Sequence, residues 1–244
     1  MKPVIFTDLD GTLLHPKDYS TTGAEDALRR VRAEKIPLVF SSSKSRAEME
    51  ALRKKLSNSH PFISENGGGV FIPKGYFPFP SGGLESDGYK TITLGVPYAR
   101  VRGALIEARA MVNGEAKGFG DMTPEEVSAL TGLGLEDARL ARARDFDEPF
   151  VFTGSPGELE RLFRLIGEKG FTWTRGRFCH ILGPHDKGKA VSILKGLYGR
   201  LYGRITTIGL GNHENDLPLL READYPVLVM NEDGSYAEGG ITGL

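Results

Sequence analysis

The sequence is short of cysteine, of charge of one sign and of long apolar runs. The single cysteine, Cys179, excludes a disulfide within the chain and fits a reducing compartment. The 31 basic and 32 acidic residues nearly cancel, and no basic tract stands out, so we expect neither a nucleic-acid nor a membrane partner. No apolar stretch approaches the roughly 20 residues of a membrane span, and none resembles a secretory signal. These absences predict a cytoplasmic protein.

The two ends of the 244-residue chain alternate between strand and helix patterns. Such repetition implies a parallel sheet with right-handed crossovers. We therefore expect a doubly wound, Rossmann-like α/β core domain built from residues 1–75 and 181–244. The strands are predicted at 4–7, 36–40, from 62, 205–210 and 227–230, and the helices at 22–34, 45–56, 186–198 and 214–222.

The middle of the chain, residues 76–180, is predicted to form an inserted α+β domain. It begins with a connector, 75–88, that is rich in glycine, proline and aromatic residues. Helix starts are marked by a cap, a proline and a glutamate, at Thr123–Glu126 and again at Ser155–Glu158. Strand-like segments lie at 150–152, 171–174 and 178–182.

Two carboxylates, Asp8 and Asp10, directly follow the first buried strand, in the string Ile5-Phe6-Thr7-Asp8-Leu9-Asp10-Gly11-Thr12. Adjacent negative charges need a cation or a proton between them. Oxygen ligands without cysteine or histidine favour a hard cation such as Mg²⁺. A carboxylate can also attack phosphorus and form an aspartyl-phosphate. For an Asp-x-Asp alone, an acidic turn would be the simpler interpretation.

Polar groups also follow the next two predicted strands, and in an open α/β sheet ligands bind at these carboxyl ends. Hydroxyls, turn amides and Lys44 in the run Ser41–Ser45 suit a phosphate, although serines are also common helix caps. The run Asn66-Gly67-Gly68 allows close backbone approach to a ligand, or is simply a tight turn.

The returning part of the chain adds two more polar strings. Lys187 stands at a helix start, which is unfavourable for the helix dipole unless an anion lies nearby. Asn212 and Asp216 follow the strand at 205–210.

Together, these strings resemble the four motifs of the haloacid dehalogenase-like (HAD) phosphohydrolases. The resemblance implies that Asp8 is the nucleophile and Asp10 the general acid/base, with Mg²⁺ as cofactor. It places Ser42 in the second motif, or Ser43 by a one-residue slip. Lys187 fits the third motif best, with Lys189 as the alternative.

The fourth motif departs from the family pattern. Asn212 stands where relatives carry a metal-binding aspartate, and an amide ligand removes one negative charge from the site. Asp216 matches the last aspartate of the motif, and Glu214 is a weaker substitute. The resemblance implies a metal site made by Asp8, Asp10, Asn212 and Asp216, weakened by the substitution.

The insertion lies between the second and third motifs, which in this family implies a large cap that closes over small phosphorylated metabolites. Segments 42–48, 63–68, 118–127, 144–150, 176–180 and 186–190 resemble one subfamily, the mannosyl-3-phosphoglycerate phosphatases. The implied activity is Mg²⁺-dependent hydrolysis of 2-O-mannosyl-3-phosphoglycerate to mannosylglycerate, a compatible solute, through an aspartyl-phosphate. Rival substrates are glucosyl-3-phosphoglycerate and sucrose phosphate, and rival functions are a phosphomutase and a non-catalytic phosphate-metabolite binder.

A strongly anionic glycoside would need cations and backbone donors. The expected substrate-binding residues are Ser43, Lys44, Asn66, Gly67, Gly68, Arg177 and His180. Asp147 and Glu148 would orient an arginine or bind sugar hydroxyls. The sequence predicts no particular oligomeric state.

Overall fold

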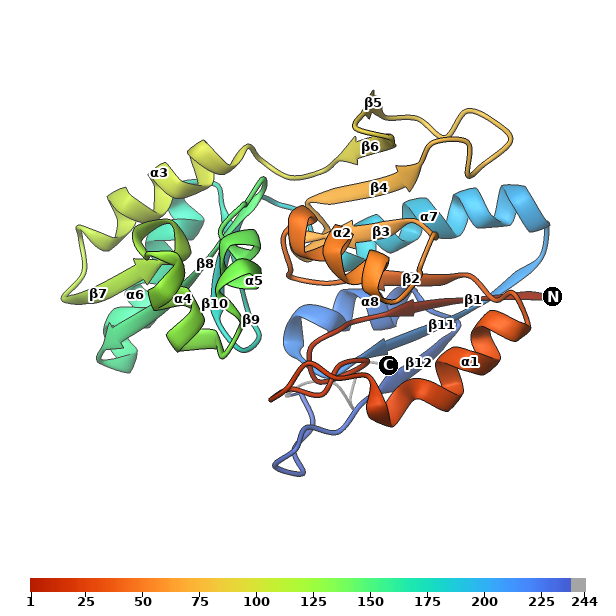
Figure 1. Cartoon of the computed structure of the whole chain (residues 1–244). Helices are drawn as coiled ribbons and strands as arrows, with labels where there is room; N and C mark the ends of the chain where they lie inside the picture. The colour runs from red at the N-terminus through yellow and green to blue at the C-terminus, as the bar shows by residue number, and fades with distance from the viewer. Residues whose placement is uncertain (238–244) are drawn as a thin grey trace.

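The computed structural model describes residues 1–237 and divides them between two sheets (Figure 1). The larger sheet has the strand order β12-β11-β1-β2-β3-β4-β6-β5, and the smaller one has the order β7-β8-β10-β9. In the described part of the chain, no helix has the length and apolar character needed to cross a membrane.

Five neighbouring strands of the larger sheet are parallel, as predicted. They are β1 (Lys2–Thr7), β2 (Leu38–Ser41), β3 (Phe62–Ser64), β11 (Ile205–Gly211) and β12 (Tyr225–Leu228). The other three are antiparallel: β4 (Gly69–Pro73), β5 (Leu84–Ser86) and β6 (Tyr89–Thr93). The expected doubly wound α/β core is therefore confirmed, with an antiparallel extension at one edge.

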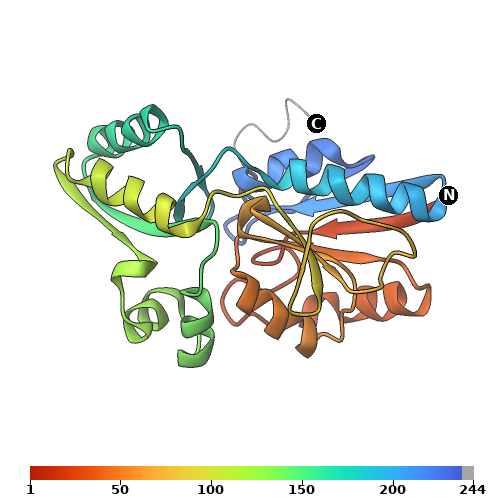
Figure 2. The same cartoon turned by 90° about the horizontal axis from the view of Figure 1, so that it is seen from above.

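Helices cover both faces of the larger sheet (Figure 2). α1 (Glu25–Ala33) and α2 (Arg46–Lys55) lie on one face, and α7 (Lys187–Tyr202) and α8 (Leu217–Glu222) lie on the other. The helix predicted at 45–56 is confirmed, and Ser45 caps it, because its hydroxyl accepts a hydrogen bond from the backbone N–H of Glu48. The helix predicted from residue 22 starts three residues later, at Glu25, because Thr22 lies inside a 3-10 turn.

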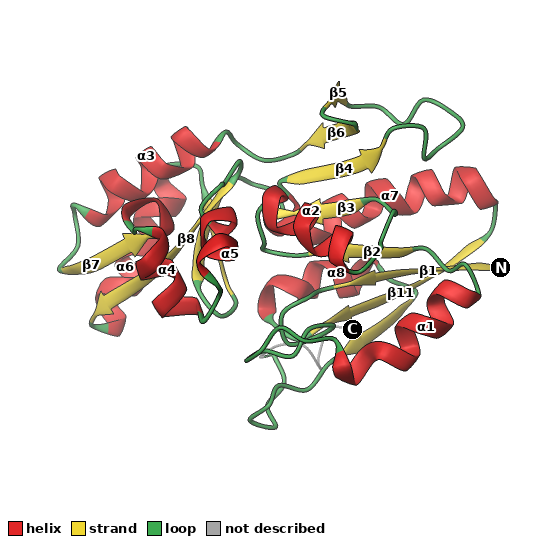
Figure 3. Ribbon diagram, viewed as in Figure 1, coloured by secondary structure: helices red, strands yellow, loops and turns green. Residues whose placement is uncertain are grey.

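The smaller sheet forms the centre of a second body (Figure 3). Its strands are β7 (Gly114–Gly118), β8 (Asp147–Gly154), β9 (Thr172–Arg175) and β10 (Cys179–Leu182), all antiparallel. Helices α3 (Tyr98–Arg109) and α6 (Pro156–Glu168) pack on one face, and α4 (Pro124–Thr131) and α5 (Leu135–Ala141) on the other. The predicted caps at Thr123 and Ser155 are both formed.

The change from one sheet to the other does not fall at residue 75. β5 and β6 pair with each other and with β4, so the larger sheet continues to Thr93. The expected connector 75–88 is therefore partly a hairpin of the larger sheet. Strand pairing supports a division near residues 94–97 on the way out and near 183–186 on the way back, and we keep the two-domain division as a proposal.

Candidate active site

A cavity of about 80 Å³ lies between the carboxyl ends of the parallel strands and the second body. Side chains of both bodies form its wall. The larger body contributes Asp8, Asp10, Tyr19, Ser43, Lys44, Glu48, His213 and Asn215, and the smaller one contributes Phe119, Thr131, Leu133, Ala141, Arg144, Pro149, Gly176, Arg177, Phe178 and His180.

Lys187 joins two of the predicted carboxylates. Its side chain is fully buried, and its Nζ lies 2.6 Å from Asp8 Oδ1 and 2.5 Å from Asp216 Oδ1. Burial opposes the lysine charge, but Asp216 and Asp8 together raise the pKa of Lys187. Burial, with the charge of Asp216, raises the pKa of Asp8 to about 7, although Lys187 acts in the opposite direction. The alternative, Lys189, bonds the carbonyl of Pro184 instead.

Asp10 is paired with Lys44, whose Nζ lies 2.9 Å from Asp10 Oδ2 and 3.7 Å from Glu48 Oε1. The two carboxylates raise the pKa of Lys44 in spite of its burial. The other oxygen, Asp10 Oδ1, is buried without a hydrogen-bond partner. A buried carboxylate oxygen without a partner is costly, so this atom is suited to a cation or a donor from a ligand.

The fourth-motif residues already have hydrogen-bond partners. Asn212 Oδ1 accepts the Thr12 hydroxyl at 3.0 Å, and Asn212 Nδ2 donates to Asn231 Oδ1 at 2.9 Å. Asp216 Oδ2 accepts the backbone N–H groups of Asn212 and His213 at 2.9 and 3.0 Å. Because Lys187 takes Oδ1, both Asp216 oxygens already have partners, and Asp216 supports the loop rather than offering a free ligand.

The oxygen donors other than Asp216 suit a hard cation but are few. Over residues 1–237, no three side chains of the His, Cys, Asp and Glu types converge as a metal site. Asp8, Asp10 and the Asn212 amide all present oxygen donors, which are the ligands that Mg²⁺ prefers.

The two candidate serines of the second motif lie in different surroundings. Ser43 lines the cavity, whereas Ser42 is 1% exposed and its Oγ accepts the N–H of Lys44. The N–H of Ser42 bonds the carbonyl of Ile63, so residue 42 continues the β2–β3 pairing and its side chain points inward. Of the two alternatives for the second motif, Ser43 is therefore the one on the cavity wall.

The run Asn66-Gly67-Gly68 is not on the cavity wall, contrary to expectation. Asn66 Nδ2 donates to Asp147 Oδ2 at 2.8 Å, and its Oδ1 accepts from Asn215 at 3.0 Å. A Cβ on Gly67 would overlap the carbonyl oxygen of Asp186, and one on Gly68 would overlap Phe146. Asn66 and Gly68 thus contact the segment that leads into β8, whereas Gly67 packs against the start of α7.

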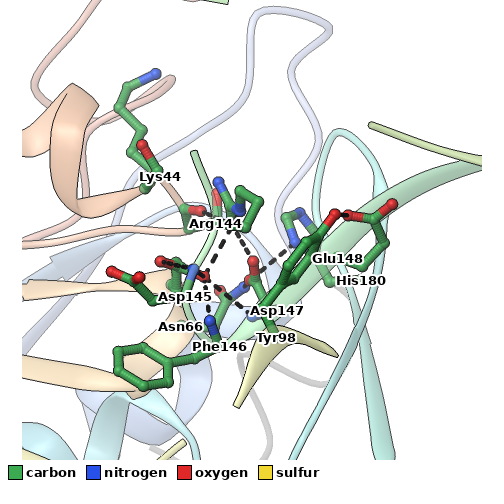
Figure 4. Close-up of polar contacts among 12 residues, drawn as sticks. Lys44, Asn66, Tyr98, Arg144, Asp145, Phe146, Asp147, Glu148 and His180 are labelled. Atoms are coloured by element: carbon green, nitrogen blue, oxygen red, sulfur yellow. Dashed lines mark hydrogen bonds and ion pairs between the residues drawn. The ribbon is translucent and has the colours of Figure 1, made fainter. Parts of the chain in front are cut away.

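Glu65, Asn66, Arg144, Asp147 and His180 form what we call the junction cluster (Figure 4, which labels the last four). The Glu65 carboxylate accepts the backbone N–H groups of residues 145–147 at 2.7–3.0 Å. Arg144 donates to Asp147 and, at 2.7 Å, to the carbonyl of Ser43. His180 Nδ1 lies 3.1 Å from Asp147 Oδ2.

The electrostatics of the junction cluster separate its two carboxyl groups. Burial raises the pKa of Glu65 to about 8, although Arg144 and the backbone N–H groups oppose the shift. Arg144 and His180 overcome the effect of burial on Asp147 and hold its pKa below the usual range. Asp147 thus orients an arginine, which is one of the two roles expected for it.

Three further residues of this region had no assigned role in the sequence. Glu65 lies beside the expected Asn66, and Arg144 lies within a segment carrying the subfamily resemblance. Either could have been found as a charged residue next to a buried strand. Tyr19 lines the cavity from a loop that carries no recognisable pattern, so no local signal indicates it.

Comparison with known proteins agrees with this fold. A family model described as haloacid dehalogenase-like hydrolase matches residues 5–81. A solved haloacid dehalogenase-like hydrolase from Bacteroides thetaiotaomicron superposes with a TM-score of 0.63 at 19% identity, covering 98% of this chain and 89% of its own. A subclass IIB sugar phosphatase gives 0.61 at 16% identity, with 96% of both chains covered. At such low identity these likenesses concern the fold.

Sequence relatives are more specific. A glucosyl-3-phosphoglycerate/mannosyl-3-phosphoglycerate phosphatase of Methanococcoides burtonii is 43% identical, over 97% of this chain and 88% of its own length. A protein of the same description from Persephonella marina is 41% identical over 99% and 90%. A mannosyl-3-phosphoglycerate phosphatase of Pyrococcus horikoshii is 37% identical over 93% and 90%. The chain therefore belongs to the haloacid dehalogenase-like hydrolases, in the group that contains these phosphatases.

Proposed function

We propose that this protein is a Mg²⁺-dependent phosphatase that hydrolyses 2-O-mannosyl-3-phosphoglycerate to mannosylglycerate and phosphate. The observation that carries the chemistry is that Asp8 and Asp10 lie on the wall of a cavity between the two bodies, with the buried Lys187 paired to Asp8 behind it. The relatives support the substrate, and because two of them are also named for the glucosyl compound, glucosyl-3-phosphoglycerate is the second candidate. The single cysteine supports a cytoplasmic location.

In the first step, an Asp8 oxygen attacks phosphorus and the bond to the glycerate oxygen breaks. Asp10 donates a proton to the leaving oxygen, which leaves an aspartyl-phosphate on Asp8. Asp10 then removes a proton from water, which attacks the intermediate and releases phosphate. Lys187 favours the charged form of Asp8 before attack, because its ammonium group opposes the effect of burial.

Ser43, Lys44 and Lys187 supply the donors for the phosphoryl oxygens. Asp8, the Asp10 backbone carbonyl and Asn212 would hold Mg²⁺, which, when bound, neutralises negative charge on the phosphoryl group. This set includes one carboxylate side chain and a neutral amide, so the site should bind the cation more weakly than one with an aspartate at position 212.

Cations on the cavity wall would bind the substrate. Arg177 and His180 come from the second body and Lys44 from the first, which suits a molecule with a phosphate and a carboxylate. The cavity of about 80 Å³ is small beside the roughly 300–1,000 Å³ of most ligand sites. Movement of the second body away from the first would enlarge this space for the substrate, and its return would close the site for the reaction.

The test is phosphate release from mannosyl-3-phosphoglycerate, glucosyl-3-phosphoglycerate, sucrose phosphate and an aryl phosphate, each with Mg²⁺ and with a chelator. A Mg²⁺-dependent preference for the mannosyl compound supports the proposal. Equal rates on all four would leave a phosphatase of unassigned substrate. Transfer of the phosphoryl group to the product would favour a phosphomutase, and no turnover at saturating Mg²⁺ would favour a binding protein.

The matched variant is Asp8→Asn, which keeps the shape of the side chain and removes the nucleophile. We expect essentially no turnover and an unchanged circular dichroism spectrum. Retained turnover would rule out Asp8 as the nucleophile.

A further inference from the structure

The backbone of Tyr19 is in an unusual conformation for an aromatic residue. Its φ is +55°, in the left-handed region that bulky side chains rarely adopt. The surrounding loop holds it there, because the N–H of Tyr19 bonds the carbonyl of His15 at 3.0 Å and the N–H of His15 bonds the carbonyl of Ser20 at 2.8 Å. A strained residue that lines a cavity is a candidate for a functional role.

The Tyr19 side chain connects the two bodies across the cavity. Its hydroxyl donates to the carbonyl of Thr131, at 3.0 Å, and accepts a hydrogen bond from Arg177 Nη1, at 2.8 Å. Its ring lies under Lys44, with Nζ 5.0 Å from the ring centroid. One side chain of the larger body therefore contacts a cation from each body.

The two cations differ in their partners. Lys44 is paired with Asp10 and Glu48, next to the Asp8 and Ser43 side of the cavity. Arg177 is oriented by the neutral Tyr19 hydroxyl and lies against the ring of Phe178, at 5.5 Å. A guanidinium that is held by a neutral group keeps its charge for an incoming anion, and its planar fork suits a carboxylate.

We propose that Tyr19 is a positioning residue that holds Arg177 for the carboxylate of a phosphorylated hydroxy acid, whose phosphate lies on the Lys44 side. This inference rests on the proposed function and deepens it, because it assigns the recognition of the acid part of the substrate. Tyr19 has no part in the chemical step, so its role lies in binding and in selecting acids over alcohols.

The test uses two small ligands of similar size, 3-phosphoglycerate, which has the carboxylate, and glycerol 3-phosphate, which has an alcohol in its place. Dissociation constants are measured by calorimetry, with a chelator present so that neither is turned over. The wild-type protein should bind 3-phosphoglycerate more tightly. In Tyr19→Phe the dissociation constant of 3-phosphoglycerate should rise about three- to tenfold, while that of glycerol 3-phosphate changes less than about twofold.

Two further variants separate positioning from general damage. Arg177→Gln should weaken the binding of 3-phosphoglycerate at least as much. Adding Tyr19→Phe to this variant should have little further effect, because both substitutions remove the same interaction. Tyr225→Phe removes a hydroxyl from a tyrosine that is 63% exposed and should change neither constant. With the mannosyl substrate and Mg²⁺, Tyr19→Phe should raise KM and leave kcat nearly unchanged.

Equal weakening of both ligands, an unchanged constant for 3-phosphoglycerate or additive effects of the two substitutions would overturn the proposal. So would a wild-type protein that does not distinguish the two ligands. A wild-type protein that distinguishes them but does not hydrolyse the mannosyl compound would instead refute the proposed substrate and leave the role of Tyr19 standing.

Discussion

Arg144→Gln should destabilise the protein by about 3–5 kcal/mol, which is the usual cost of removing one partner of a buried ion pair. The Arg144 side chain is 2% exposed, and those of Asp147 and Glu65 are fully buried. Its guanidinium donates to Asp147, and its Nε lies 3.6 Å from Glu65 Oε2. Asp147 dominates the cost, because its pKa is held low and it stays charged, whereas burial raises the pKa of Glu65 to about 8.

The assay is guanidinium unfolding followed by circular dichroism, with thermal unfolding as a second measurement. For a chain of this size each kcal/mol shifts Tm by about 2–4 °C, so we expect a fall of about 6–20 °C. Arg139→Gln is the matched control: it breaks an ion pair with Glu136 in which the side chains are 50% and 81% exposed, and it should cost at most about 1 kcal/mol.

A second variant, Arg144→Gln with Asp147→Asn, removes both charges and should recover part of the lost stability. The reasoning is refuted if Arg144→Gln costs less than about 1 kcal/mol, or if the double variant is no more stable than the single one.

Three further outcomes follow from the same geometry. Asn212→Asp should tighten Mg²⁺ binding about tenfold or more, measured by calorimetry without substrate, because it restores a charged oxygen ligand; unchanged affinity would contradict the metal assignment. Burial raises the pKa of Glu65 from 4.5 to about 8, so between these pH values the folded state binds more protons than the unfolded state. The protein therefore loses stability as the pH rises through this range. Urea titrations should show that the unfolding free energy of the wild type, minus that of Glu65→Gln, decreases as the pH rises from about 5 to about 8. A constant difference would argue against the raised pKa of Glu65. Gly67→Ala should destabilise the protein by more than about 1 kcal/mol, because φ is +97° and the new Cβ would overlap the Asp186 carbonyl. The control Gly196→Ala, in an open part of α7, should stabilise the protein by about 0.5–1 kcal/mol. Similar effects at both sites would contradict the packing argument.

The parallel strands and their helices could be predicted because their signals are local. Short apolar runs predict strands, and caps such as Ser45 predict helix starts, wherever the segment later packs. Two of the antiparallel strands, β5 and β7, have no such local signal. β7 (Gly114–Gly118) carries no apolar alternation, and its pairing with β8 decides its conformation. The same holds for β5, a short edge strand whose residues are all exposed.

In the site, the sequence by itself determined the chemistry at the strand ends: the carboxylates of Asp8 and Asp10, and the lysine at the start of α7. Only the tertiary structure decided that Ser43 rather than Ser42 lines the cavity, because the hydrogen bonds of Ser42 to Lys44 and Ile63 form only in the folded chain.

The tertiary structure also decided the contacts between the two bodies. Asn66 and Asp147 are 81 residues apart, Ser43 and Arg144 are 101 apart, and Tyr19 and Arg177 are 158 apart. No local pattern encodes such pairs, because each side chain acquires its partner only when separately folded surfaces meet. The residue types that perform the chemistry are thus written in short segments, whereas the closed cavity and the residues that orient its cations result from how those segments pack.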